Sequence, residues 1–458
     1  MSIRSLPMRL RRLGVVGAAG AAAIGLIAPA VAGASPSAKI PVVIKSAQAI
    51  TALNDQVAKG TLQRNHGSVN RCAALGYGCK YRLVTTAKGS KLALTAKAPV
   101  GWGATGLEKA FGLTHSPNGT GRVVVVGFGA FPTLESDLAT YRNQYHLPPC
   151  LTATGCLKIQ RYDGGPPLLP SDPQAEENIG VETALDVEMV SASCPSCTIT
   201  YLGIPLDSTD QQAAYRMGIA AQTAKRQGAA AVTISYGLPA NKTTDFGTPA
   251  QMMTTKGMQI FSAAGDYGYM DPETFQSPIG GFPQNLRTVV SAGGTTMTYG
   301  PNGSYVMKAW SGAGSGCSPD LGPAAGQWAV IANQCHQHRA VSDVSAVADN
   351  LAVYDTYFPY SGYSGGWIVV GGTSASSPFL AGMAGRSPRL ASVLGPNVFY
   401  GAPRWAYTDV KTGSNGTPAQ CSADHVGAAL CKSGSGWDGA TGLGTPAGLQ
   451  PFTHSTVT

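Results

Sequence analysis

The chain has 458 residues, of which 59 are glycine, and its formal charge at pH 7 is +8. Charged residues make up 12% of the chain and apolar residues 43%, a balance that excludes a disordered protein and supports a well-buried core. Four arginines lie within the first twelve residues, so the rest carries only +4 without a Lys/Arg cluster, and we expect no nucleic-acid partner.

Residues 1–34 combine a basic start, an apolar run of Ala, Gly, Leu and Val, and small residues at Ala32 and Ala34. This pattern predicts a secretory signal peptide cut near Ala34, with a retained membrane anchor as the alternative. Arg11 and Arg12 could form a twin-arginine signal, although their neighbours match one poorly. We therefore expect a secreted, extracellular protein that has no membrane contact after signal cleavage.

Ten cysteines fit an exported protein, because oxidising compartments allow disulfides to persist. Pairing between sequence neighbours is the simplest connectivity. It gives five couples: Cys72/Cys79, Cys150/Cys156, Cys194/Cys197, Cys317/Cys335 and Cys421/Cys431. The "SCPSC" segment could instead be a redox Cys-x-x-Cys, but no thioredoxin-like context surrounds it, and metal binding by these cysteines is less favoured still.

Residues 35–100 carry few periodic signals, and the sequence changes character at "GWGATGLEKAFGL" (101–113), which predicts a helix. "GRVVVVGFGAF" (121–131) follows, with the unbroken β-branched run of a buried parallel strand. Helical patterns occupy 137–147 and 210–228. Further short apolar strands are predicted within 198–204, 229–237, 257–266, 287–295 and 367–373. The alternation predicts an α/β fold with a mainly parallel central sheet flanked by helices.

Two acidic residues, Glu182 and Asp186, lie four apart in the helical pattern "GVETALDVEM". They share one helix face, where like charges repel unless one is protonated or engaged. The alternative interpretation is a solvated acidic face.

The segment "GGTSASSP" (371–378) passes from an apolar strand into a helical pattern and puts Ser374 at a helix start, with Pro378 in the first turn. Free backbone N–H groups at such a position face an anion. A plain Gly-Thr-Ser loop is the alternative. None of the seven histidines stands in the His-Gly-Thr-His context of a subtilisin base.

"GVETALDVEM", "FSAAGDYG" and "GGTSASSP", in that order, resemble the sedolisin family of serine-carboxyl peptidases, which have a subtilisin-like fold and a glutamate in place of the histidine. The resemblance covers about Gly101 to Gly448. It implies catalytic roles for four residues: Glu182 as general base, Asp186 as its orienting partner, Asp266 in the oxyanion hole and Ser374 as nucleophile. It also makes "SYG" (235–237) resemble the edge segment that pairs with an extended substrate.

These roles imply an enzyme that works in acid. A carboxylate accepts the serine proton while ionised, and the glutamate pKa is about 4.3 in model peptides. Asp186 can share a proton with Glu182, and a protonated Asp266 donates to an oxyanion that an ionised aspartate would repel. Taken alone, Asp266 is better interpreted as a turn aspartate between glycines.

The resemblance further implies one structural Ca²⁺ in a C-terminal segment. "YTDVKTG" and "GSGWDGATGLGTP" would supply the carboxylates of Asp409 and Asp438. Backbone carbonyls would come from Val410, Gly434 and Gly436, and such hard oxygen ligands suit calcium.

We expect residues 1–34 to be the signal peptide, 35–100 a short prosegment or arm, and 101–458 the peptidase domain. Residues 35–100 do not match the long propeptide usual in sedolisins, so their role stays open between a reduced prosegment, a permanent arm and no inhibitory role. We expect protein or peptide substrates and a monomer. Endopeptidase and tripeptidyl-peptidase activity both remain open. A catalytically inactive secreted binding protein on the same fold is the alternative.

Overall fold

The computed structural model describes most of the chain beyond residue 45. The described residues are 43–44, 46–61, 68–69, 78–79, 82–84, 94–95, 98–115, 119–238, 246–269, 281–318, 321–331, 334–357, 365–387, 395–417, 419–420 and 428–456. The predicted signal peptide lies outside them. No helix among these residues is long and apolar enough to cross a membrane.

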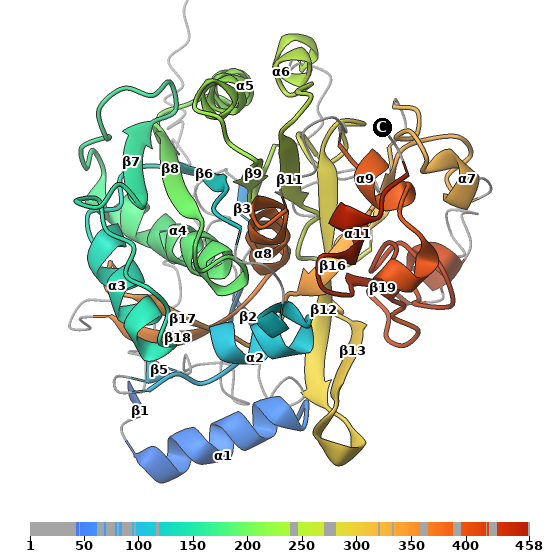
Figure 1. Cartoon of the computed structure of the whole chain (residues 1–458), viewed down its shortest axis with the longest axis horizontal. Coiled ribbons are helices and arrows are strands. Elements are labelled where there is room, and N and C mark those ends of the chain that lie inside the picture. The colour runs from blue at the N-terminus through green and yellow to red at the C-terminus, as the bar shows by residue number, and fades with distance from the viewer. Residues whose placement is uncertain are drawn as a thin grey trace, which may run out of the picture. The chain divides into compact units, whose positions relative to one another are not determined.

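An eight-stranded sheet lies at the core of residues 40–458, in the order β13-β12-β11-β9-β6-β8-β7, with β16 also paired to β12 (Figure 1). Its pairs are parallel, apart from the antiparallel pair of β12 with β13. The strands are β6 (Arg122–Phe128), β7 (Leu157–Arg161), β8 (Thr198–Ile204), β9 (Ala231–Ile234), β11 (Gln259–Ala263), β12 (Val290–Tyr299), β13 (Tyr305–Ala309) and β16 (Val344–Val347).

The composition of β6 explains its place in the middle of this sheet. Val123 to Val126 are fully buried and pair with β8 on one side and β9 on the other. A strand covered on both faces reads as a continuous apolar run rather than an alternating one. The predicted α/β fold with a mainly parallel sheet is therefore confirmed.

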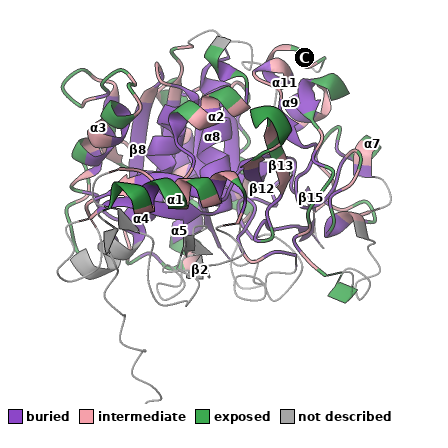
Figure 2. Ribbon diagram, turned by 90° about the horizontal axis from the view of Figure 1, so that it is seen from below, coloured by how far each residue is buried: buried purple, intermediate pink, exposed green. Residues whose placement is uncertain are grey.

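Two long helices, α4 (Pro173–Ser193) and α8 (Thr373–Gly385), pack against each other, and α8 also lies on β9, β11 and β12 (Figure 1). Gly382 allows this close crossing, because a Cβ there would lie 2.0 Å from Ser193 Oγ. Every residue of α8 is buried, whereas α1 shows exposed residues along its length (Figure 2).

The remaining helices are shorter or lie at the periphery. The α-helices are α1 (Ala47–Ala58), α2 (Ala104–Ala110), α3 (Leu134–Gln144), α5 (Asp210–Arg226), α6 (Gly247–Met252), α7 (Trp328–Ile331), α9 (Asn397–Tyr400) and α11 (Gln450–Thr453). The 3₁₀ turns are η3 (Leu113–His115), η4 (Pro301–Gly303), η6 (Arg404–Ala406) and η7 (Ala428–Leu430).

A second sheet contains β18 (Gly366–Gly371) as a central strand. It pairs antiparallel with β17 (Leu351–Asp355), the preceding strand in the chain. We expected the apolar run 367–373 in the main sheet, and that placement is wrong. An apolar run predicts a strand but not its partner. The other members come from residues 43–95: β1 (Val43–Ile44), β2 (Ser68–Val69), β4 (Arg82–Val84) and β5 (Leu94–Thr95).

Three two-stranded pairs complete the fold. They are β3 (Gly78–Cys79) with β10 (Tyr236–Gly237), β14 (Gly316–Cys317) with β15 (Ala340–Val341), and β19 (Tyr407–Thr408) with β20 (Thr445–Pro446). The first pair joins residues 78–79 to a short strand that begins two residues after the end of β9.

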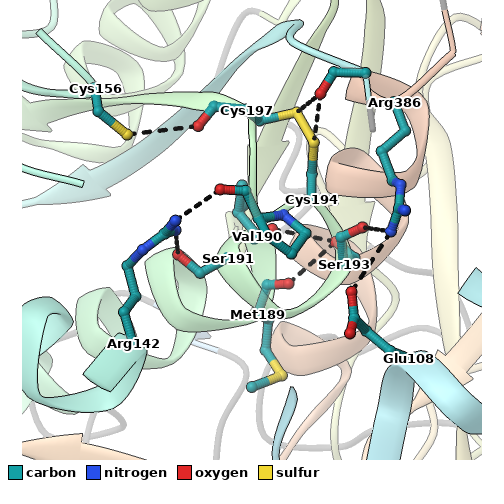
Figure 3. Close-up of a disulfide and its surroundings, with 12 residues drawn as sticks. Glu108, Arg142, Cys156, Met189, Val190, Ser191, Ser193, Cys194, Cys197 and Arg386 are labelled. Carbon is teal, nitrogen blue, oxygen red and sulfur yellow. Dashed lines mark hydrogen bonds and ion pairs between the residues drawn. A yellow bond between two sulfur atoms is a disulfide. The ribbon is translucent and has the colours of Figure 1, made fainter. Parts of the chain in front are cut away.

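Three of the five predicted disulfides are confirmed: Cys150–Cys156, Cys194–Cys197 and Cys317–Cys335. Cys431 is also disulfide-bonded, but Cys421 and Cys72 lie outside the described residues, so the two remaining pairings stay predictions. The Cys194–Cys197 bridge closes the turn between α4 and β8 (Figure 3).

The buried Arg386 joins the end of α8 to the end of α4. It donates to the Ser193 carbonyl at 3.0 Å and lies 3.7 Å from the Glu108 carboxylate (Figure 3). The bond to Ser193 links the C-terminal ends of α8 and α4, the two helices that carry predicted catalytic residues.

Candidate active site

Ser374 is the second residue of α8, as predicted, and it is fully buried. The preceding glycine, Gly372, has φ 153°, a conformation that favours glycine, and it turns the chain from β18 into the helix. Ser374 Oγ makes no hydrogen bond within the described part of the chain.

Pro378 lies inside α8 rather than in its first turn, so that detail of the prediction is wrong. Its consequence is local. Proline has no N–H, so the carbonyl of Ser374, four residues earlier, receives no helical hydrogen bond from it. The hydroxyl of Ser235 lies 3.5 Å from this carbonyl oxygen instead.

Glu182 and Asp186 lie in the middle of α4, and both are fully buried. The alternative of a solvated acidic face is therefore wrong. Asp186 Oδ1 accepts a hydrogen bond from Ser235 Oγ at 2.6 Å. Ser235 thus touches both the helix that carries the two acids and the backbone of Ser374.

Burial raises the pKa of Asp186 well above its usual range, and the Ser235 hydrogen bond offsets only part of that rise. The raised pKa favours the protonated, neutral form of Asp186. A neutral Asp186 one helical turn from Glu182 removes the repulsion that two ionised carboxylates would feel at that spacing.

Asp266 is fully buried three residues after β11, and it contacts the residue before Ser374. Its Oδ1 accepts the backbone N–H of Thr373 at 2.8 Å and lies 3.0 Å from Thr373 Oγ1. Thr373 Oγ1 also accepts the backbone N–H of Gly265 at 3.0 Å. Because Oδ1 is the acceptor in these contacts, a proton on Asp266 would belong on Oδ2.

These residues follow the carboxyl ends of neighbouring parallel strands. Ser235 comes directly after β9 and Asp266 three residues after β11, and β9 and β11 are paired. Active residues of open α/β sheets gather at this edge. The structure thus brings Asp186 within reach of Ser235 beside Ser374, and Asp266 within reach of Thr373.

Sequence reasoning missed the roles of two side chains, Ser235 and Thr373. The signals were present, since Ser235 begins the "SYG" segment and Thr373 precedes Ser374. The Ser235 hydroxyl contacts Asp186, which lies 49 residues away in sequence, and the Thr373 hydroxyl contacts Asp266, which lies 107 residues away. No local sequence pattern predicts contacts over such separations.

No described histidine approaches these groups by a hydrogen bond. His336 and His338 lie in the turn after Cys335, and the one hydrogen bond made by a histidine side chain here joins His454 to Thr453. The two acidic residues on α4 stay the candidates that the sequence predicts for accepting the serine proton.

Four of the five predicted calcium ligands contact one another in two pairs. The Gly436 N–H points at the Asp409 carboxylate, at 3.2 and 3.1 Å from its two oxygens, and the Gly434 N–H lies 3.3 Å from Asp438 Oδ2. Asp438 is 2% exposed, and burial raises its pKa to about 6. A buried carboxylate is destabilised without a positive partner, and no Lys or Arg in the described ranges forms an ion pair with Asp438.

Carboxylate oxygens such as those of Asp409 and Asp438 suit calcium, and the carbonyls of Val410, Gly434 and Gly436 stay predicted ligands. The described residues hold no group of three His, Cys, Asp or Glu side chains that could bind a metal, so most ligands would have to be carbonyls.

Comparison with known proteins gives partial matches in sequence and a longer one in structure. No family model matches the chain. Kumamolisin from Bacillus sp. (strain MN-32) is 26% identical over 219 residues, 42% of this chain and 36% of kumamolisin. Tripeptidyl-peptidase sed1 from Aspergillus fumigatus is 32% identical over 115 residues, 24% of this chain and 15% of sed1. The matches span about a third of these relatives or less.

The solved structure of Pseudomonas sedolisin, a serine-carboxyl proteinase complexed with two molecules of pseudo-iodotyrostatin, superimposes with a TM-score of 0.61. The match covers 79% of this chain and 99% of that chain at 19% identity. The chain is similar in sequence and in fold to sedolisin-type peptidases. At this identity the structural likeness shows the fold, which is the subtilisin-like α/β fold expected from the sequence. In this fold α4, Ser235 after β9 and the start of α8 meet at one edge of the sheet.

Proposed function

We propose that this protein is a secreted serine-carboxyl peptidase that hydrolyses peptide bonds in acid through an acyl-enzyme on Ser374. Glu182 is the general base, Asp186 its orienting partner and Asp266 the oxyanion donor. Protein or peptide substrates follow from this chemistry. Residues 1–34 direct export, and residues 101–458 form the peptidase domain.

One observation supports the proposal above the others. Asp186 on α4, Ser235 after β9 and the backbone of Ser374 on α8 are joined through a single hydroxyl, at 2.6 Å and 3.5 Å. Acidic residues buried beside a serine at a helix N-terminus are costly for folding unless the site uses them. The same observation disfavours the alternative of an inactive binding protein, which needs none of these groups.

The reaction balances with these residues. Ser374 Oγ attacks the peptide carbonyl carbon while its proton moves to Glu182, and the oxyanion accepts a hydrogen bond from protonated Asp266. The C–N bond then breaks, and Glu182 returns the proton to the leaving amine. Water next loses a proton to Glu182 and attacks the ester carbonyl. The bond from the acyl carbon to Ser374 Oγ then breaks, Glu182 returns its proton to Oγ, and the acid product leaves with both residues restored.

The proposed calcium site supports the fold rather than the chemistry. Asp409, Val410, Gly434, Gly436 and Asp438 would hold one Ca²⁺, which supplies positive charge to two carboxylates in the C-terminal loops. A metal that binds only the folded state stabilises it by mass action.

The test is hydrolysis of a denatured protein substrate from pH 3 to pH 8 by the parent and by Ser374→Ala. The proposal expects cleavage by the parent with an acidic optimum and none by the variant. Binding of the substrate by both proteins without cleavage by either would instead support the inactive binding protein.

A further inference from the structure

A cavity of about 880 Å³ lies at the end of α8 that is opposite Ser374, and we call it the α8-end cavity. Its walls come from the end of α2, from β13, from β20 and α11, and from the residues that directly follow α8. Arg386 is the first residue after α8, so its backbone lies about 18 Å from that of Ser374 along the helix. The cavity is therefore separate from the candidate active site, and its volume is within the range of small-molecule sites, about 300–1,000 Å³.

Apolar side chains from several elements line the α8-end cavity. They are Phe111 after α2, Met307 on β13, and Pro446 and Leu449 around the end of β20. Phe111 and Leu449 are buried, and Met307 is half-buried. A ligand with an apolar chain fits this wall, and each methylene group that it buries there should strengthen binding about fourfold.

The charged residues that line this cavity are all basic. They are Lys109 in the last turn of α2, Arg386 after α8 and His454 after α11, and no described Asp or Glu lines it. Lys109 and His454 are exposed, and neither forms an ion pair with another described residue. An anionic group on a ligand therefore meets complementary charge at this site.

Arg386 is the least available of these three cations. Its side chain is buried, donates to the Ser193 carbonyl at 3.0 Å and lies 3.7 Å from the Glu108 carboxylate (Figure 3). It also stands at the C-terminal end of α8, where the last backbone carbonyls favour a cation. Its charge thus serves the fold, and Lys109 and His454 are the cations that a ligand can use.

Ser387 adds an unpaired polar group at the same end of the cavity. It lines the cavity and is 4% exposed, and its hydroxyl makes no hydrogen bond within the described part of the chain. A buried hydroxyl without a partner destabilises a fold. A ligand with a hydrogen-bond acceptor suits this lining better than a purely apolar ligand does.

We propose that the α8-end cavity binds an apolar monocarboxylate. Its carboxylate pairs with Lys109 and His454, and its chain packs on the apolar wall. This chemistry has two sources, a free fatty acid and the C-terminal residue of a peptide that ends in an apolar side chain. The proposal does not rest on the proposed peptidase activity, because none of the proposed catalytic residues lines the cavity.

The experiment is isothermal titration calorimetry of the full chain at pH 6 with octanoate, decanoate and octan-1-ol. The chain carries Ser374→Ala, so that peptide probes stay uncut. Decanoate should bind about 15-fold more tightly than octanoate, because it buries two more methylene groups. Octan-1-ol should bind about tenfold or more weakly than octanoate, because it carries no charge to pair with the cations. No binding of either carboxylate at about 10 mM, or equal affinity for octanoate and octan-1-ol, overturns the proposal.

Substitutions of the two exposed cations test the location of the site. The double variant Lys109→Ala/His454→Ala should bind decanoate about tenfold or more weakly than the parent. Lys158→Ala/His336→Ala is the matched control, since both residues are exposed and neither lines the cavity, and it should bind decanoate like the parent. Melting temperatures verify that both double variants are folded. Parent-like affinity in Lys109→Ala/His454→Ala overturns the proposal.

Two peptide probes distinguish the sources of the carboxylate. They are N-acetyl-Leu-Leu-Phe with a free C-terminus and the same peptide as its C-terminal amide. Displacement of decanoate by the acid but not by the amide supports the proposal with a peptide C-terminus as a ligand. Displacement by neither peptide supports it with free fatty acids as the ligands. Equal displacement by the acid and the amide would show that the cavity does not recognise a carboxylate, and would overturn the proposal.

Discussion

Thr373 donates its backbone N–H to Asp266 Oδ1 at 2.8 Å, and this contact fixes which oxygen of Asp266 can serve the reaction. With Oδ1 accepting from Thr373, the second oxygen is the one that can carry a proton toward an oxyanion. The residue next to the proposed nucleophile therefore orients the proposed oxyanion donor.

Asp266→Asn should retain more activity than Asp266→Ala. An amide nitrogen can still donate to the oxyanion, whereas alanine removes a donor worth roughly 3–4 kcal/mol, or about 10²- to 10³-fold in kcat. The asparagine variant should also keep a larger share of its activity toward neutral pH, because its donor does not depend on a proton. Measurement of kcat against pH for both variants checks this. Equal losses in the two variants would contradict the donor role.

Ser235→Ala should lower kcat by about 2- to 10-fold, since a typical hydrogen bond contributes about 0.5–1.5 kcal/mol. The Ser235 hydrogen bond lowers the pKa of Asp186, so its loss raises that pKa further. The basic limb of the pH profile should therefore move to higher pH. Ser377→Ala is the control, because Ser377 is equally buried but its hydroxyl bonds to Thr233. A lowered kcat with an unmoved pH profile would mean a merely structural role.

The sequence alone predicted the fold class, the helix that carries Glu182 and Asp186, and the helix start at Ser374, because periodicity and short motifs are local signals. It did not predict that β18 belongs to the second sheet, because an apolar run predicts a strand but does not indicate which strand it pairs with. It also missed the hydroxyl of Ser235 between Asp186 and Ser374. The pairing of Gly78–Cys79 with β10 was equally hidden, because two short segments far apart in sequence carry no shared pattern.

Asp349 should make the protein more stable in acid than near neutrality. Burial raises its pKa from 3.8 to about 7 in the folded state, so its contribution is fully present below about pH 4 and is lost as pH rises through 7. The loss is at most about 4 kcal/mol, since one pKa unit is about 1.4 kcal/mol.

Asp349→Asn should therefore flatten the fall in the free energy of unfolding between pH 4 and pH 7, measured by denaturant titration. Asp55→Asn on the exposed part of α1 is the control and should leave that slope unchanged. A fall in the asparagine variant as steep as in the parent would rule out Asp349 as a contributor.

Removal of calcium should lower the melting temperature. At a free Ca²⁺ concentration of about a hundred times Kd, a site of this kind stabilises the fold by about 2.7 kcal/mol. Asp438→Asn should melt at the same temperature with and without chelator, whereas Asp207→Asn, at an exposed carboxylate outside the loop, should respond like the parent. The calcium proposal fails if the parent itself does not respond to chelation.

The central claim is that a carboxylate, rather than a histidine, accepts the proton of Ser374. Glu182→Gln keeps the shape of the side chain, but glutamine cannot act as a base. When two residues act together, the losses of activity caused by substituting each of them do not add up in the double variant. The most direct measurement is kcat at the acidic optimum for Glu182→Gln, Ser374→Ala, their double variant and His336→Ala/His338→Ala, with melting temperatures to verify folding. The account predicts near-complete loss in both single variants, little further loss in the double variant and parent-like activity without the histidines. Retained activity in Glu182→Gln together with its loss in the histidine variant would contradict it.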